Sequence, residues 1–283
     1  MAPPSPPPPP PPPNDRASPQ PPPSPSPDGE EEEGEEEGNA ENIGFVQPAT
    51  LGLFGVSQSG KSTFLTSLIR RRHSGVFSRP VGHTYVFFNV WTAEYETLHA
   101  DLPTRDITFI RGKLTTDFLR EELEMPPVGG RAQVPLFVLD DLGGQADADL
   151  TELITVYTHH YDIFLAMCHH CLTSQQRGGA AHEFRTQVSN MQYSCLFRQR
   201  DLTAIGRLGT QIQGPGRSQL FVNIYKDALR KPYAYLLVDH RPTCPDKFQL
   251  RTDVLRPFHP DPAQAGPCIV YERIDGQDDD DDA

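Results

Sequence analysis

Short apolar runs alternate with segments of helical spacing along most of the chain. The apolar runs predict strands at 50–56, 84–91, 106–110, 134–139, 163–168, 193–197 and 233–240. Apolar residues at helical spacing predict helices, among them 63–72, 93–99 and 115–124. Strands that alternate with helices indicate an α/β fold with a doubly wound, mainly parallel sheet. In such a sheet, ligands bind at the carboxyl ends of the strands.

The two ends of the chain lack this pattern. Of the 30 prolines, 16 precede Asp28, and a glutamate-rich stretch follows them. Five aspartates occupy 278–282 near the other end. Proline tracts favour extended conformations, and runs of like charge bury no apolar surface. We therefore expect disordered tails at 1–42 and 272–283, and one folded domain at 43–271.

The tails also account for the acidic charge of the chain, which is −13 overall. Residues 1–42 hold ten acids and one base, and residues 272–283 hold seven acids and one base, so 21 acids and 23 bases remain between them. A near-neutral domain with acidic tails does not argue against a nucleic-acid partner.

The sequence has no apolar run of membrane-spanning length and no secretory leader, and its five cysteines are scattered. We expect an intracellular protein with reduced thiols and no membrane contact.

The most specific motif lies between the first predicted strand and the first predicted helix. It has the G-x-x-x-x-G-K-[ST] form of a phosphate loop, in the strand–loop–helix context that this motif needs. Backbone amides and the helix N-terminus would hold the phosphates of ATP, Lys61 would reach the β and γ phosphates, and Ser62 would bind Mg²⁺. A glycine turn that only starts a helix is the alternative. The predicted nucleotide-binding residues are Gly55, Val56, Ser57, Gln58, Ser59, Gly60, Lys61, Ser62 and Thr63.

Two acids follow the apolar run at 134–139. In phosphate-loop nucleotidases a carboxylate at the end of such a strand helps to hold Mg²⁺. We assign Asp140 to the metal and Asp141 to the general base that takes a proton from the attacking water. Acids after a strand also begin turns or cap helices, which is the alternative.

Two other phosphate-loop classes fit less well. The residues Asp141 to Gly144 match the D-x-x-G of GTPases, but "NIYKD" at 223–227 has the wrong spacing for the guanine-binding N-K-x-D. Small-molecule kinases usually carry an arginine-rich lid, which is not evident here. A nucleotide-dependent switch or scaffold with slow hydrolysis remains the alternative to a motor.

The cluster Cys168-His169-His170-Cys171 has two interpretations. A structural zinc site needs four ligands, typically two spaced pairs, and Cys195, Cys244 and Cys268 supply no second pair. The other interpretation is positional, because the polar end of the strand at 163–168 would open toward the same phosphate as Asp140.

Six motifs together resemble one family. "GLFGVSQSGKSTFL", "TYVFFNVWTAEYETL", "PLFVLDDL", "THHYDIFLAMCHH", "FRQRDLTAIGRLGTQI" and "PYAYLLVDHRPTCPDKFQLRTDV" occur in order. They are similar to the genome-packaging ATPases of polinton-like and larger double-stranded DNA viruses, in the FtsK/HerA superfamily. The resemblance implies a RecA-like P-loop ATPase that uses ATP and Mg²⁺, assembles as a homo-oligomeric ring, and drives double-stranded DNA of any sequence into a preformed capsid. It also implies capsid components as partners, and a location in the host nucleus, at the virus assembly site or in the virion.

The resemblance implies two further site residues. The family has a polar γ-phosphate sensor at the end of the fourth strand, usually glutamine, and that place falls at His169 or His170 here, with Gln175 as a third candidate. We take His170 as the candidate. Ring motors also use an arginine from the neighbouring subunit, and Arg200, which precedes an aspartate, matches best. Arg198 and Arg207 are the alternatives.

Overall fold

The computed structural model describes residues 44–140, 148–173, 179–255 and 268–272. The tail expected at 1–42 lies outside these ranges, and so does the tail expected at 272–283 apart from Glu272. None of the helices in the described ranges combines the length and the apolar character that a membrane span requires.

A single nine-stranded sheet forms the centre of the fold, in the order β3-β2-β4-β5-β1-β6-β7-β8-β9. The six strands from β3 to β6 in this order pair in parallel, whereas β7, β8 and β9 are antiparallel. The expected α/β fold with a mainly parallel sheet is confirmed. The strands are β1 (Ala49–Phe54), β2 (Val81–Phe88), β3 (Ile107–Arg111), β4 (Val134–Asp140), β5 (Phe164–His169), β6 (Tyr193–Leu196), β7 (Leu236–Asp239), β8 (Leu250–Thr252) and β9 (Ile269–Val270).

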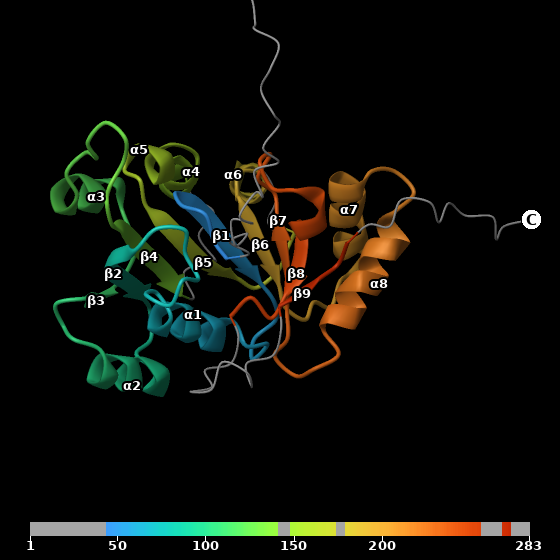
Figure 1. The fold of residues 1–283 in the computed structure, drawn as a ribbon, viewed down its shortest axis with the longest axis horizontal. Coiled ribbons are helices and arrows are strands. Elements are labelled where there is room, and N and C mark those ends of the chain that lie inside the picture. Colours follow the sequence, from blue (N-terminus) through green and yellow to red (C-terminus); the bar gives the residue numbers. More distant parts are fainter. Residues whose placement is uncertain (1–43, 141–147, 174–178, 256–267, 273–283) are drawn as a thin grey trace, which may run out of the picture. The chain divides into compact units, whose positions relative to one another are not determined.

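Helices cover both faces of the sheet, as a doubly wound fold requires (Figure 1). One face packs against α1 and α2, and the other packs against α3, the π-helical turn η1, α6, α7 and α8. The helices are α1 (Lys61–Arg70), α2 (Ala93–Asp101), α3 (Thr116–Glu122), α4 (Ala148–Glu152), η1 (Leu153–Tyr157), α5 (Thr158–His160), α6 (Gly179–Ser189), α7 (Leu202–Gln213) and α8 (Ser218–Ala228), and a short 3₁₀ helix, η2 (Asp246–Phe248), precedes β8.

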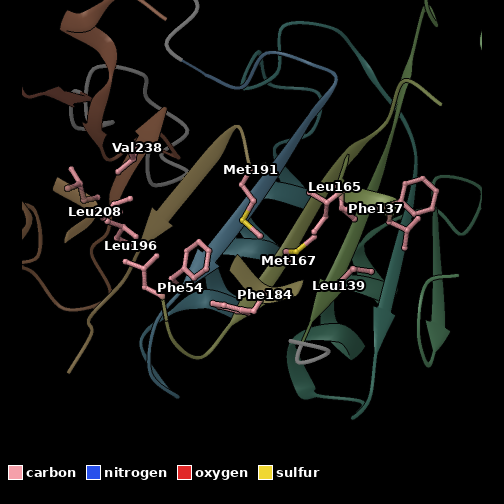
Figure 2. Close-up of a cluster of buried hydrophobic side chains, with 14 of the residues drawn as sticks. Phe54, Phe137, Leu139, Leu165, Met167, Phe184, Met191, Leu196, Leu208 and Val238 are labelled. Atoms are coloured by element: carbon pink, nitrogen blue, oxygen red, sulfur yellow. The ribbon is translucent and has the colours of Figure 1, made fainter. Parts of the chain in front are cut away.

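Burial on both faces explains the continuous apolar runs in the central strands. All seven residues of β4 are buried. Phe137 and Leu139 belong to one core, and Leu136 and Val138 belong to the core on the opposite face. Figure 2 shows Phe54, Phe137, Leu139, Leu165 and Met167 among the side chains of the first core. Side chains alternate along a strand, so each central strand supplies apolar residues to both cores.

The predicted boundaries shift where side chains take other roles. The strand predicted at 84–91 ends at Phe88, because Thr92 caps α2 by accepting a hydrogen bond from the Tyr95 amide. The strand predicted at 233–240 is shorter and begins at Leu236. The prediction did not name β8 and β9, which are short strands beside β7.

Candidate nucleotide-binding site

The phosphate loop leaves β1 in the middle of the sheet and is bonded to both neighbouring strands. The Gly55 amide donates to the His169 carbonyl of β5 at 3.1 Å, and the Val56 amide donates to the Arg198 carbonyl after β6 at 3.2 Å. The loop therefore lies at the carboxyl ends of the parallel strands, where the fold class places its ligands.

Both motif glycines are required by the geometry of the loop. A Cβ atom on Gly55 would lie 2.6 Å from Ser59 Oγ and 2.7 Å from Phe197 Cβ, so no larger side chain fits. Gly60 has a φ of 106°, a left-handed conformation that L side chains rarely adopt. The loop can turn tightly enough to start α1 at Lys61 only with these two residues.

Lys61 bridges the loop from the first residue of α1. Its Nζ atom donates to the carbonyl oxygens of Gly55 at 2.7 Å and Val56 at 3.0 Å, and the residue is 8% exposed. A flexible ammonium held over the loop carbonyls can exchange these acceptors for phosphate oxygens. The position agrees with the phosphate-binding role that the motif predicts for Lys61.

Ser62 and Asp140 meet beside this loop. The Ser62 hydroxyl lies 3.4 Å from Asp140 Oδ2, although the two residues are 78 positions apart in the chain. Both groups present hard oxygen atoms, which suit Mg²⁺, and Mg²⁺ commonly uses one or two protein ligands with substrate phosphates and water. The pair therefore fits the magnesium site that the sequence predicts.

Tyr95 of α2 is a second hydroxyl partner of Asp140. Its hydroxyl donates to Asp140 Oδ2, the same oxygen that faces Ser62. Burial raises the pKa of the Tyr95 hydroxyl well above its usual value, and the negative charge of Asp140 raises it further. Tyr95 therefore keeps its proton and acts as a donor that orients the carboxylate. The sequence prediction missed this residue, because nothing in the spacing of α2 distinguishes it from a core tyrosine.

Asp141 and Gln175 lie outside the described residues. The general-base role of Asp141 and the alternative sensor role of Gln175 therefore remain predictions from the sequence.

His169 and His170 lie in different environments at the end of β5. His169 is 2% exposed, its ring stacks on Phe54 with centroids 5.1 Å apart, and it meets Phe184 edge to face. Burial lowers the pKa of His169 to about 4, and the positive charges of His170 and Lys61 add to this effect. His170 is exposed, one position past the strand. The sensor role of His170 remains a prediction.

The side chains of the cluster at 168–171 do not point toward a common site. Cys168 belongs to the core that packs against α1, whereas His169 contacts the opposite core. Cys171 donates to the Thr173 carbonyl. Within the described ranges, no group of three or more histidine, cysteine, aspartate or glutamate side chains is placed to hold a metal ion.

The three candidate arginines lie after β6 and on α7. Arg198, Arg200 and Arg207 are all exposed. Asp201 accepts hydrogen bonds from the amides of Thr203 and Ala204, so it caps α7. An exposed Arg200 beside this cap is compatible with a contact to a neighbouring subunit, and its role remains a prediction.

The comparisons with known proteins give distant structural likenesses. No family model and no curated protein matches the chain. A solved structure of EssC (ATPases 2 and 3) from Geobacillus thermodenitrificans is 16% identical with a TM-score of 0.39, and the cytoplasmic domain of EssC is 17% identical with a TM-score of 0.36. Each match covers 82% of this chain and 41% of the other chain, so this chain spans less than half the length of these structures. Likenesses of this size do not determine function.

Proposed function

We propose that this protein is an ATP-hydrolysing motor that moves double-stranded DNA, and that the DNA is a viral genome packaged into a preformed capsid. The meeting of Ser62 with Asp140 beside Lys61 carries the ATPase part of this proposal. The ordered motifs that resemble viral packaging ATPases support the DNA and capsid parts.

The arrangement assigns separate roles to the residues of the site. The loop amides and Lys61 bind the phosphates, and Ser62 and Asp140 hold Mg²⁺. When bound, Mg²⁺ neutralises charge that develops on the transferring phosphoryl group. Asp141 takes the proton of the attacking water, and the hydroxyls of Ser62 and Tyr95 contact Asp140 Oδ2. Bound nucleotide and metal would thus be held by the phosphate loop, the first residues of α1 and the end of β4.

Turnover with and without DNA tests the ATPase and the motor together. We expect the full chain to hydrolyse ATP, and linear double-stranded DNA of unrelated sequences to stimulate it several-fold. Lys61→Ala should reduce turnover at least a hundredfold, because the phosphate charge loses its cation. A preference for GTP, or turnover that DNA does not change, would favour the alternative of a nucleotide-dependent switch.

The ring and the arginine finger are part of the same proposal. If Arg200 acts on the site of a neighbouring subunit, Arg200→Ala subunits retain intact phosphate loops and Lys61→Ala subunits retain the arginine. Mixing the two inactive variants should then restore part of the activity. Arg207→Ala, on the exposed surface of α7, is the matched variant: rescue with it in place of Arg200→Ala would move the role to Arg207.

A further inference from the structure

A hollow lies on the other side of the phosphate loop from Asp140. Its volume is about 420 Å³. The loop lines it on one side, and the segment from Leu229 to Ala234, which leads into β7, lines it on the other together with Arg198. Neither Asp140 nor Ser62 is among its lining residues.

Tyr233 stands out in this lining. Its side chain is exposed, with 71% of its surface accessible, beside a loop that binds charged groups. A Cβ atom on Gly60 would lie 3.1 Å from Tyr233 Cβ, so this tyrosine packs directly over the turn that begins α1. The Tyr233 ring is therefore open to solvent beside the loop and is not part of the buried core.

The backbone of Tyr233 is also unusual. Its φ is 62°, in the left-handed region that bulky residues rarely occupy. Such conformations concentrate at ligand-binding sites, where the surrounding structure holds them in place. An exposed aromatic ring on a left-handed backbone thus lies at the edge of the hollow.

The order of the strands gives the direction in which a nucleotide would lie. Asp140 ends β4, which is separated from β1 by β5, whereas the hollow lies toward β6 and β7 on the opposite side of β1. A nucleotide with its terminal phosphates on the Asp140 side would extend its nucleoside toward the opposite side, where the hollow lies.

We propose that the Tyr233 ring is the platform on which the base of the bound nucleotide stacks. This inference rests on the proposed function, since it requires the nucleotide phosphates to bind at Lys61. An exposed aromatic ring stacks on the face of any base, so Tyr233 would strengthen binding without choosing the base by hydrogen bonds.

The test compares ATP with inorganic tripolyphosphate, which has the phosphates and no base. Tyr233→Gly removes the ring and suits the left-handed backbone, so its melting temperature should equal or exceed that of the natural chain. We expect the dissociation constant for ATP to rise about tenfold and that for tripolyphosphate to change less than twofold. Tyr233→Phe keeps a stacking ring and should retain tight ATP binding. Asp253→Gly, at another left-handed position with φ 58°, is the matched backbone control.

Two results would overturn the base platform. Tyr233→Gly could leave ATP affinity unchanged, or it could weaken ATP and tripolyphosphate equally, which would mean that the ring shapes the loop instead. A different result would contradict the proposed function. If Lys61→Ala left the affinities for ATP and for tripolyphosphate unchanged, the phosphates would not bind at the loop. A loss of both ligands in Lys61→Ala with a loss of ATP alone in Tyr233→Gly supports both proposals.

Discussion

Two buried carboxylates at strand ends differ in their partners. Asp140 ends β4 at 8% exposure, and in the described part of the chain its bonded side chains are the hydroxyls of Ser62 and Tyr95. Asp239 ends β7 at 1% exposure, and it is bonded to the guanidinium groups of Arg241 and Arg251 at 2.8–2.9 Å.

The different partners indicate different roles for the two carboxylates, one suited to ligand binding and one to stability of the fold. Two guanidinium groups neutralise Asp239 and satisfy both its oxygens, so this carboxylate joins β7 to β8 within the fold. The bonded side chains of Asp140 are hydroxyl groups, which carry no charge, and carboxylate oxygens with such partners are suited to a divalent cation. The same residue type thus has a proposed metal-binding role at the end of a parallel strand and joins two strands in the antiparallel part of the sheet.

The largest effect is expected at the metal site. Asp140→Asn keeps an oxygen that can accept from Tyr95 but removes the charge that holds Mg²⁺, which contributes several kcal/mol to phosphoryl transfer. Turnover should fall at least a thousandfold, while the melting temperature stays the same or rises. Steady-state ATP hydrolysis and thermal melting measure the two effects. More than a tenth of natural turnover in this variant would remove Asp140 from the metal site.

The second effect is on stability and belongs to the other carboxylate. Asp239→Asn leaves the buried Arg251 and the partly buried Arg241 without their counter-charge, so we expect the free energy of unfolding to fall by about 3 kcal/mol. Urea unfolding measures it. Asp117→Asn is the matched control, because the Asp117–Arg120 pair is exposed and its loss should leave the free energy of unfolding nearly unchanged. Equal changes in the two variants would contradict the structural role of Asp239.

A smaller effect is expected at Tyr95. Tyr95→Phe removes a hydroxyl that orients the Asp140 carboxylate, and groups that orient metal ligands commonly change metal affinity about tenfold. The Mg²⁺ concentration for half-maximal turnover should therefore rise about tenfold, with full turnover recovered at saturation. Tyr193→Phe is the control: Tyr193 is also buried, and its hydroxyl accepts from the Val46 amide, away from the site. Equal Mg²⁺ requirements in all three proteins would show that the Tyr95 hydroxyl does not support the metal site.

The smallest effect concerns pH. The folded-state pKa of His169 is about 4, below its unfolded value of 6.5, so the unfolded chain binds the proton more readily. Stability should therefore be lost as pH falls below about 6.5, by about 1 kcal/mol per such group between pH 7 and 5.5. His169→Phe, beside Phe54 and Phe184, should remove this part of the dependence. Urea unfolding at the two pH values measures it, and a dependence unchanged from the natural chain would contradict it.

His240 provides the internal comparison for this measurement. Burial also lowers its pKa to about 4. A residual dependence of similar size should therefore persist in His169→Phe.

The sequence predicted what depends on neighbouring residues in the chain. The strand, loop and helix around Lys61 and Ser62, and the strand that ends at Asp140, could be predicted because the motif and the flanking apolar runs are local. The strand at 134–139 was predicted from its continuous apolar run, which the structure explains by burial on both faces.

The remaining features depend on contacts between distant segments. Tyr95 meets Asp140 across 45 positions, and Tyr233 meets Gly60 across the loop before β7; neither contact leaves a pattern in the sequence. The antiparallel direction of β7 was not predicted either, because an apolar run has no direction. The different environments of His169 and His170 were not predicted either. β5 ends at His169, so His169 is buried within the strand and His170 lies just after it. An apolar run followed by polar side chains does not define the end of a strand to one residue.

Movement along DNA tests the central claim most directly. The full chain is added with ATP and Mg²⁺ to linear double-stranded DNA that carries a bound third strand, and release of the third strand is measured. The account predicts ATP-dependent release with the natural protein and none with Lys61→Ala. Vigorous ATP hydrolysis without release of the third strand, on DNA of several lengths and sequences, would contradict the motor.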